Sequence, residues 1–301
     1  MADRKGKAQT EKAILAAIAA NTIFGFSFMA TRIAIGQTAP AILLSLRFII
    51  SFLIMLILVL IGIGKVSLKG KPIGMFILMG LCEPVIYFIA ETNGIKYTTS
   101  SFSGVLISLI PVVTAVLSHV FIHEKLSARR LCWILFSVAG VVLISVSQTS
   151  EGVVTIRGIV YLLVAVISAA FHSVLSRSIA DKFSSFERTF IMLLLACVFF
   201  TGNAIVQEGA AFGQAFAAAV QNKYVILPVL FLSVVSSVIA FFCTNYAVTY
   251  LEVSRAAVFA NIVPVVSVLA GVLILQEPFS VAFVIGIVMI LSGVYMVNKV
   301  K

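Results

Sequence analysis

The chain has 301 residues, of which 61% are hydrophobic and only 11% are charged, and its mean hydropathy is +1.18. A water-soluble domain has roughly 25% charged residues, so this chain has too few charges to cover a globular surface in water. The formal net charge of +10 follows the loops between apolar segments, which indicates membrane topology and excludes nucleic acid as a partner. The composition predicts an all-α integral membrane protein whose surrounding medium is the lipid bilayer.

Ten apolar segments follow one another along the chain, near the length of about 20 residues that a hydrocarbon layer of about 30 Å requires. Helices are expected because backbone polar groups in lipid must be bonded within their own segment. The predicted spans cover residues 13–34, 41–63, 73–92, 102–121, 131–147, 158–179, 189–207, 225–248, 256–275 and 281–298.

The first apolar segment follows Arg4, Lys5 and Lys7, as the apolar core of a secretory signal peptide would. Because it continues through Phe24 to Ile35, we interpret it as a full span. The four cysteines lie within apolar segments without C-x-x-C spacing, so small buried side chains are expected. The sequence predicts neither a metal site nor a cofactor.

The lysines and arginines divide unequally between the two sets of loops. If the N-terminus is cytoplasmic, the inner segments carry sixteen, the outer segments four, and one (Arg47) lies within a span. Such a bias follows the positive-inside rule and predicts a multi-pass protein of the cell membrane with both termini in the cytoplasm. The longest outer connection, 208–224, has Phe212 and Phe216 four residues apart, and either a short interfacial helix or a partly ordered loop fits it.

An internal repeat divides the chain into halves near 1–150 and 151–301. Residues 110–127 read IPVVTAVLSHVFIHEKLS and residues 263–280 read VPVVSVLAGVLILQEPFS, an offset of 153 that also relates Gly140 to Gly293. Because each half has five spans, the second half must enter the membrane from the opposite side. Inverted repeats of this kind place a substrate site at the interface of the halves and alternate its access between the two sides.

A family resemblance rests on residues 95–127, IKYTTSSFSGVLISLIPVVTAVLSHVFIHEKLS, on the second copy from Asn245 to Val297, and on LRFIISF in the second span. These segments resemble the EamA-type families of the drug/metabolite transporter superfamily. The resemblance implies a ten-helix basket around a central cavity lined by spans 1, 3, 4, 6, 8 and 9, with spans 5 and 10 peripheral. It leaves the substrate open, since the superfamily carries amino acids, nucleotide-linked and quaternary-amine metabolites, and drugs.

Glu83 is the candidate residue with the clearest physical argument. A charge at mid-span costs about 2.5–3.5 kcal/mol on insertion scales, and the equivalent residue in the second half is Val235, so the scaffold does not require it. A cavity carboxylate for cation recognition or proton exchange is favoured over a structural one. Tyr87 and Glu91 continue its helix face, Glu91 near the outer end, where a solvated role is equally compatible.

His172, at mid-span in the sixth helix, is interpreted either as a proton relay or as a packing residue. We expect it to face Glu83 across the interface of the halves, beside a water-filled cavity. Proton coupling is assigned to these two residues. Arg47 is expected to be paired or to extend towards the membrane surface.

Repeat-equivalent prolines, Pro111 and Pro264, remove a backbone donor in the fourth and ninth spans, and Ser108 and Asn261 each precede one of them by three residues. Bent helices at matching positions of two halves indicate a binding site, although a structural kink fits equally. Glu124 and Glu277 end the same two spans at opposite membrane faces, and we interpret them as helix ends or gates.

Aromatic side chains on the expected cavity helices could stack on a ring or a quaternary amine. Together with the polar candidates they give the predicted substrate-binding set: Glu83, Tyr87, Ser108, His172, Asn261, Phe24 and Tyr246. The sequence thus predicts a secondary transporter of a small organic metabolite, such as an amino acid, an amine or a drug-like compound. Protons are an expected co-substrate, and the protein is expected to be a monomer or a homodimer.

An intramembrane enzyme and a channel are the alternatives. The enzyme would need a motif such as H-E-x-x-H or G-x-S-x-G within a span, and neither occurs in the sequence. A channel is less compatible with inverted halves and with the lack of a filter-like loop.

The charge bias makes a topological prediction. Reporter proteins fused after Lys301 or within the loop 64–72 should both report the cytoplasm, because both positions lie on the basic side of the membrane. A signal from the outer side at either position would contradict the count of ten spans.

Overall fold

A computed structural model describes residues 2–67, 73–122, 127–150, 154–177, 183–250 and 259–299. Within these ranges the chain is helical, without strands. The first half contains α1 (Ala2–Ile35), α2 (Pro40–Leu60), α3 (Ile73–Gly80), η1 (Leu81–Ile86), α4 (Tyr87–Lys96), α5 (Ser100–Ile107), α6 (Ile110–Ile122) and α7 (Ala128–Ser150). The second contains α8 (Ile156–Arg177), α9 (Ser185–Glu208), η2 (Gly209–Ala211), α10 (Phe212–Gln221), α11 (Lys223–Leu230), η3 (Phe231–Ala240), α12 (Phe241–Tyr250), α14 (Ile262–Leu273) and α15 (Val281–Lys299).

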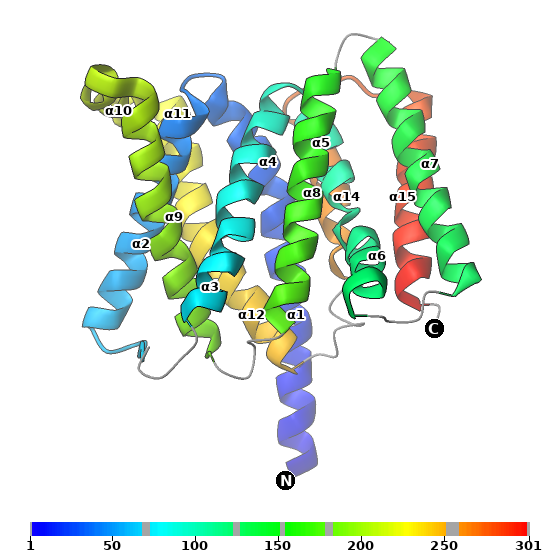
Figure 1. The fold of residues 1–301 in the computed structure, drawn as a ribbon, viewed down its shortest axis with the longest axis horizontal. Helices are drawn as coiled ribbons and strands as arrows, with labels where there is room; N and C mark the ends of the chain where they lie inside the picture. The colour runs from blue at the N-terminus through cyan, green and yellow to red at the C-terminus, as the bar shows by residue number, and fades with distance from the viewer. Residues whose placement is uncertain are drawn as a thin grey trace.

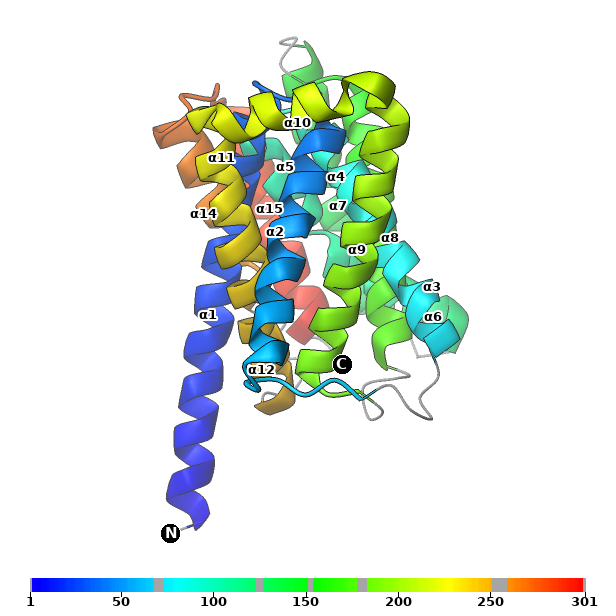
Figure 2. The same ribbon diagram turned by 90° about the vertical axis from the view of Figure 1, so that its left-hand side faces the viewer.

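These elements confirm the predicted all-α membrane fold. Seven described helical runs are long and apolar enough to cross a membrane, and the shorter apolar helices Leu131–Ser147, Ile262–Leu273 and Val281–Met296 bring the total to ten. The connection between the seventh and eighth spans is the helix α10, which lies across the ends of α2 and α9 (Figure 2). Phe212 and Phe216 pack there against an apolar cluster of α2 and α11.

The two halves run in opposite directions through the membrane. Arg32, in the last turn of α1, donates to the carbonyl oxygens of Ile95 and Lys96 at 2.8 and 3.1 Å. Thr155, immediately before α8, donates from its backbone N–H to the Tyr97 carbonyl oxygen. The first helix of one half therefore ends where the first helix of the other begins. Both termini of the chain lie on the opposite side (Figure 1).

Helix packing repeats when the halves are exchanged. α7 packs on α15 at one edge of the bundle (Figure 1) and α2 packs on α9, so each helix of these two pairs contacts its own repeat equivalent. The fourth and ninth spans, which are also equivalent, meet through α5 and α14. The first span of each half also packs on the third span of the other half: α1 contacts η3 and α12, and α8 contacts η1 and α4. Phe48 of α2 stacks on Phe200 of α9, with ring centroids 5.1 Å apart and planes at 14°.

The third span of each half is irregular at the same position. η1 and η3 are both π-helical segments, and both follow the start of their span by eight residues. In η1 the cause is local, because Pro84 lacks an N–H and disfavours the helical conformation of the residue before it. Glu83 accordingly has φ −140° and ψ 118°.

The fourth and ninth spans are interrupted just before their prolines. α5 ends at Ile107 and α6 begins at Ile110, with Pro111 as its second residue. α14 begins at Ile262 after a turn at Asn261, and Pro264 is its third residue. Proline is well accommodated in a first helical turn, where its missing N–H has no helical partner.

Small residues line the contact between α7 and α15. A Cβ added at Gly140 would lie 2.8 Å from the Gly286 carbonyl oxygen. At the equivalent place, Gly293 faces Ser137, whose hydroxyl donates to the Ile290 carbonyl oxygen at 3.0 Å. Close packing of small residues replaces the hydrophobic effect as the source of helix association in lipid.

We therefore expect Gly140→Ala to lower the free energy of unfolding by about 1–3 kcal/mol, the usual cost of overpacking. Thermal unfolding of the purified protein in detergent measures it. Gly202→Ala in α9 is the matched control, since an added Cβ there meets nothing within 4 Å. Equal stability of the two variants would contradict the tight crossing.

Candidate functional site

The break in the third span presents a carboxylate to the other half. Because the backbone is extended at Glu83, the regular helical ladder is interrupted there. The Cys82 carbonyl oxygen accepts from the Tyr87 backbone N–H, five residues on, and also from the Ser168 hydroxyl of α8 at 2.7 Å. The Glu83–Pro84 peptide bond is cis. A contact between the halves thus adds a second hydrogen bond to a backbone carbonyl at the break.

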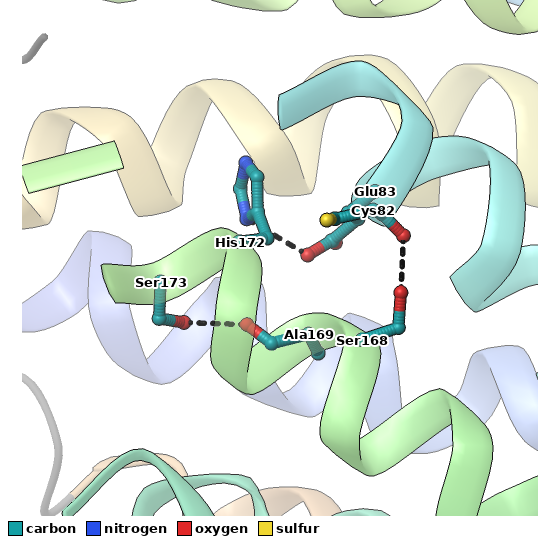
Figure 3. A network of polar contacts seen from close by, with 6 residues as sticks. All are labelled: Cys82, Glu83, Ser168, Ala169, His172 and Ser173. Atoms are coloured by element: carbon teal, nitrogen blue, oxygen red, sulfur yellow. Dashed lines mark hydrogen bonds and ion pairs between the residues drawn. The ribbon is translucent and has the colours of Figure 1, made fainter. Parts of the chain in front are cut away.

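Glu83 and His172 form an ion-pair contact across this break (Figure 3). Nδ1 of His172 lies 3.0 Å from Oε2 of Glu83, and each side chain is 17% exposed. Nε2 of His172 is buried without a hydrogen-bond partner in the described part of the chain. An imidazole beside a carboxylate can hold a proton between them or release it, which is the chemistry expected of a relay.

A small apolar cavity adjoins the residue after Glu83. Its volume is about 10 Å³, the room needed for one water molecule. Its walls are Phe48, Pro84, Phe88, Thr189, Met192, Leu193 and Phe241. Helices of both halves line it, α2, η1 and α4 from one and α9 and α12 from the other. In this structure the interface of the halves is therefore nearly closed around the break.

Arg47 was expected to be paired or to extend towards the surface, and the second expectation is wrong. Its side chain is 3% exposed, with Nε 3.0 Å from the Ser237 hydroxyl and Nη2 3.4 Å from the Ser236 hydroxyl. Its Cζ lies 4.5 Å from the ring centre of Phe88. The hydroxyls and the ring hold the cation inside the bundle, so it does not need to reach the membrane surface.

A solvated Glu91 is likewise contradicted. Glu91 is 4% exposed, and its Oε1 accepts from the Tyr87 hydroxyl at 2.9 Å. The residue lies on α4, one helical turn beyond Tyr87, and its carboxylate and Arg47 attract each other electrostatically. Tyr87, four residues after Glu83, is thus hydrogen-bonded to the buried carboxylate of Glu91.

The other predicted site residues are distributed more widely. Phe24 contacts the cavity wall through Phe241, edge to face at 5.5 Å. The Ser108 hydroxyl donates within its own segment to the Val105 carbonyl oxygen. Oδ1 of Asn261, before α14, is buried without a partner among the described residues.

Tyr246 also lies apart from this cavity. It packs against the cluster of Ala13, Ala17 and Ala247, between α1 and α12, and stacks obliquely on Tyr250 at 4.8 Å. Glu124 falls outside the described residues. Within the described ranges, no three His, Cys, Asp or Glu side chains gather closely enough to hold a metal ion.

Glu277 joins the two halves at the end of the bundle where α1 ends. Its carboxylate accepts from the backbone N–H groups of Ser100 and Ser101 at 2.7 and 2.9 Å, and also from the Ser101 hydroxyl. A carboxylate at a helix N-terminus bonds otherwise unpaired donors and complements the helix dipole. A pocket of about 490 Å³ lies beside this contact, between Arg32, Thr99 and the loop 275–278.

Two features were not recognised in the sequence. The Ser168–Cys82 contact joins residues 86 positions apart, and nothing in either segment indicates it. The serines around Arg47 did leave a signal, since Ser233, Ser236 and Ser237 recur three and four residues apart in an apolar span. Such spacing places hydroxyls on one helix face.

Comparison with known proteins agrees with this duplicated architecture. The model of the EamA-like transporter family matches residues 11–146 and again residues 156–299. A Bacillus subtilis protein named uncharacterized transporter YcxC is 29% identical over 96% of this chain and 93% of its own. An uncharacterized transporter of Archaeoglobus fulgidus is 26% identical over 92% of this chain and 95% of its own. One crystal structure shares the fold, with a TM-score of 0.63 and 19% identity over 95% of this chain and 96% of its own.

Proposed function

The chain belongs to the EamA-like transporter family, and we propose that it is a secondary transporter that moves a small organic metabolite across the cytoplasmic membrane, coupled to protons. The observation that carries the coupling is the contact between Glu83 and His172 across the two halves. A titratable pair between mobile parts can bind a proton in one arrangement and lose it in the other. The proposed substrate class is that of amino acids, amines and drug-like compounds.

The pair has the chemistry for exchange between a proton and a cationic group. When His172 is protonated, Glu83 has a positive partner at 3.0 Å. When His172 is neutral, the carboxylate can instead receive the ammonium group of a substrate, because a charge this deep in the membrane needs compensation. Competition of this kind couples proton release to substrate binding, with Phe24 and Phe241 available to stack on the substrate.

The interrupted helices support the proposal of alternating access. Ser108 and Asn261 precede Pro111 and Pro264 in spans that pack on each other across the halves, so bending there changes which membrane side reaches the interface. We assign the outer gate to Glu277, whose three contacts hold α5 against the end of the ninth span. The repeat assigns the corresponding inner gate to Glu124.

The coupling is tested with Glu83→Gln, which keeps size and hydrogen bonding but removes the titratable group. Purified protein in proteoliposomes is supplied with radiolabelled amines and amino acids, with and without a pH gradient, while an enclosed pH dye records proton movement. We expect Glu83→Gln to abolish substrate-coupled proton movement or cation selectivity, although the protein still inserts and folds.

Glu11→Gln, at an exposed position before the first span, is the matched carboxylate control and should behave as wild type. Wild-type transport by Glu83→Gln, with an unchanged dependence on pH, would assign the residue a structural role. A wild type that transports nothing from the panel under either gradient would contradict this substrate class.

The outer gate is tested by access from outside. In a variant without the four native cysteines, Ser108→Cys places a thiol below the gate, where the native side chain is 7% exposed. We expect Glu277→Ala to raise its rate of labelling by an impermeant maleimide about tenfold, because the lost contacts no longer favour the closed arrangement. Glu208→Ala is the control, and equal rates for both variants would exclude Glu277 as the gate.

A further inference from the structure

Arg47 is a buried cation whose hydrogen-bond partners are neutral. Among the described residues its hydrogen bonds go to the hydroxyls of Ser236 and Ser237 in η3, and one face of the guanidinium lies on Phe88. Within the described ranges no carboxylate oxygen lies at ion-pair distance from it. Arginine stays protonated in proteins, so this positive charge must be balanced by a group that does not touch it.

Glu91 supplies that balance from a distance. Its carboxylate attracts Arg47 electrostatically, and its own direct hydrogen bond comes from Tyr87. Arg47 belongs to α2, Glu91 to α4 and the two serines to the opposite half. A guanidinium can form two parallel hydrogen bonds to one carboxylate. Glu91 does not form these bonds with Arg47.

The surroundings of Arg47 suit an anion with an apolar body. Phe48 and Phe88, the rings on which the guanidinium lies, are also walls of the small cavity. Met192, Leu193 and Phe241 complete an aliphatic and aromatic lining on the opposite side. Parting of the halves would enlarge this cavity beside the cation.

We propose that Arg47, oriented by Ser236 and Ser237, binds the carboxylate of an organic acid with an apolar body, and that Glu91 takes up a proton as this anion arrives. The proposal deepens the proposed transport function and rests on it. It assigns to the substrate an anionic group, and to the protein a second proton-exchanging carboxylate besides Glu83.

The proton balance is explicit. Before binding, one guanidinium cation faces the Glu91 carboxylate. Binding of a carboxylate would leave two anions for one buried cation, so one proton from solvent joins Glu91 and the net charge of the cluster is unchanged. The hydrogen bond to Tyr87 persists with its direction reversed, because the carboxylic O–H of Glu91 donates to the phenol oxygen.

The titratable groups around Glu91 are few. Tyr87 lies on its own helix, Arg47 acts from α2, and Glu83 acts from η1. α8 adds His172, which contacts Glu83, and α1 adds Arg32, which bonds to carbonyls at the outer end of α4. α5, the remaining helix packed on α4, has no titratable side chain.

The test uses three probes with one apolar body: sodium benzoate, benzylamine and benzyl alcohol. Isothermal titration of the purified full-length protein, in buffers of different ionisation enthalpy, gives both the Kd and the number of protons taken up. We expect benzoate to bind at least about tenfold more tightly than the other two, with uptake of about one proton. Equal affinity for benzoate and benzyl alcohol, or no binding of benzoate, would overturn the proposal.

Variants separate the roles of the residues. Arg47→Gln should raise the Kd for benzoate at least about tenfold, because it removes the cation. Ser237→Ala should raise this Kd about threefold, because Ser237 no longer orients the guanidinium. Glu91→Gln should still bind benzoate but without proton uptake. Arg157→Gln, an exposed arginine at the outer end of α8, is the control and should match wild type.

The binding results with these variants test the Arg47 site independently of transport. Wild-type affinity in Arg47→Gln, or undiminished proton uptake in Glu91→Gln, would contradict the assignment. If Arg47→Gln does not fold, Ser237→Ala and Glu91→Gln carry the same test. Binding at equilibrium needs no turnover, so a failure here is distinct from a failure of flux in the proteoliposome experiment.

Discussion

A polar group inside a membrane must find its partner within the protein, and this constraint organises the whole molecule. At the two π-helical segments, a backbone carbonyl also contacts another segment. The Cys82 carbonyl oxygen accepts from the Tyr87 backbone N–H and from the Ser168 hydroxyl of the opposite half, and the Ser51 hydroxyl of α2 lies 3.2 Å from the Ser233 carbonyl oxygen in η3. Irregular helix and contacts between the halves therefore occur at the same places in the third and eighth spans.

The same constraint explains where charge lies. Glu83, Arg47 and Glu91 each cost free energy in the bilayer, and all three lie at contacts between helices, where hydroxyls, an imidazole and aromatic rings receive them. Two clusters result, one across η1 and α8 and one across α2, α4 and η3. Both adjoin the small cavity, because Glu83 directly precedes Pro84, Arg47 lies on Phe88, and Pro84 and Phe88 line that cavity.

Much of this fold could be predicted because its causes are local or repeated in the sequence. Length and hydropathy give the spans, and the shared pattern around Pro111 and Pro264 gives the repeat, since both depend on single segments. The approach of His172 to Glu83 could be expected only as a consequence of the family resemblance and mid-span depth. The burial of Arg47 and Glu91 could not be predicted, because the position of a residue along a helix does not determine which way its side chain points. The rotation of α2 about its axis depends on packing against α9 and η3, and that of α4 on packing against α8, all of which are remote in the chain.

The repeat is symmetrical in its backbone but not in its charges. Two identical five-helix chains packed in opposite orientations would have the same side chain at both equivalent positions. Either two carboxylates or none would then lie at their interface. Joined in one polypeptide, the halves have diverged: Glu83 stands in one π-helical segment and Val235 in the other. Under the proposed coupling, one carboxylate instead of two would limit proton exchange at that position to a single proton. That limit would come from the difference in sequence between the two halves, because both keep the same five-span fold.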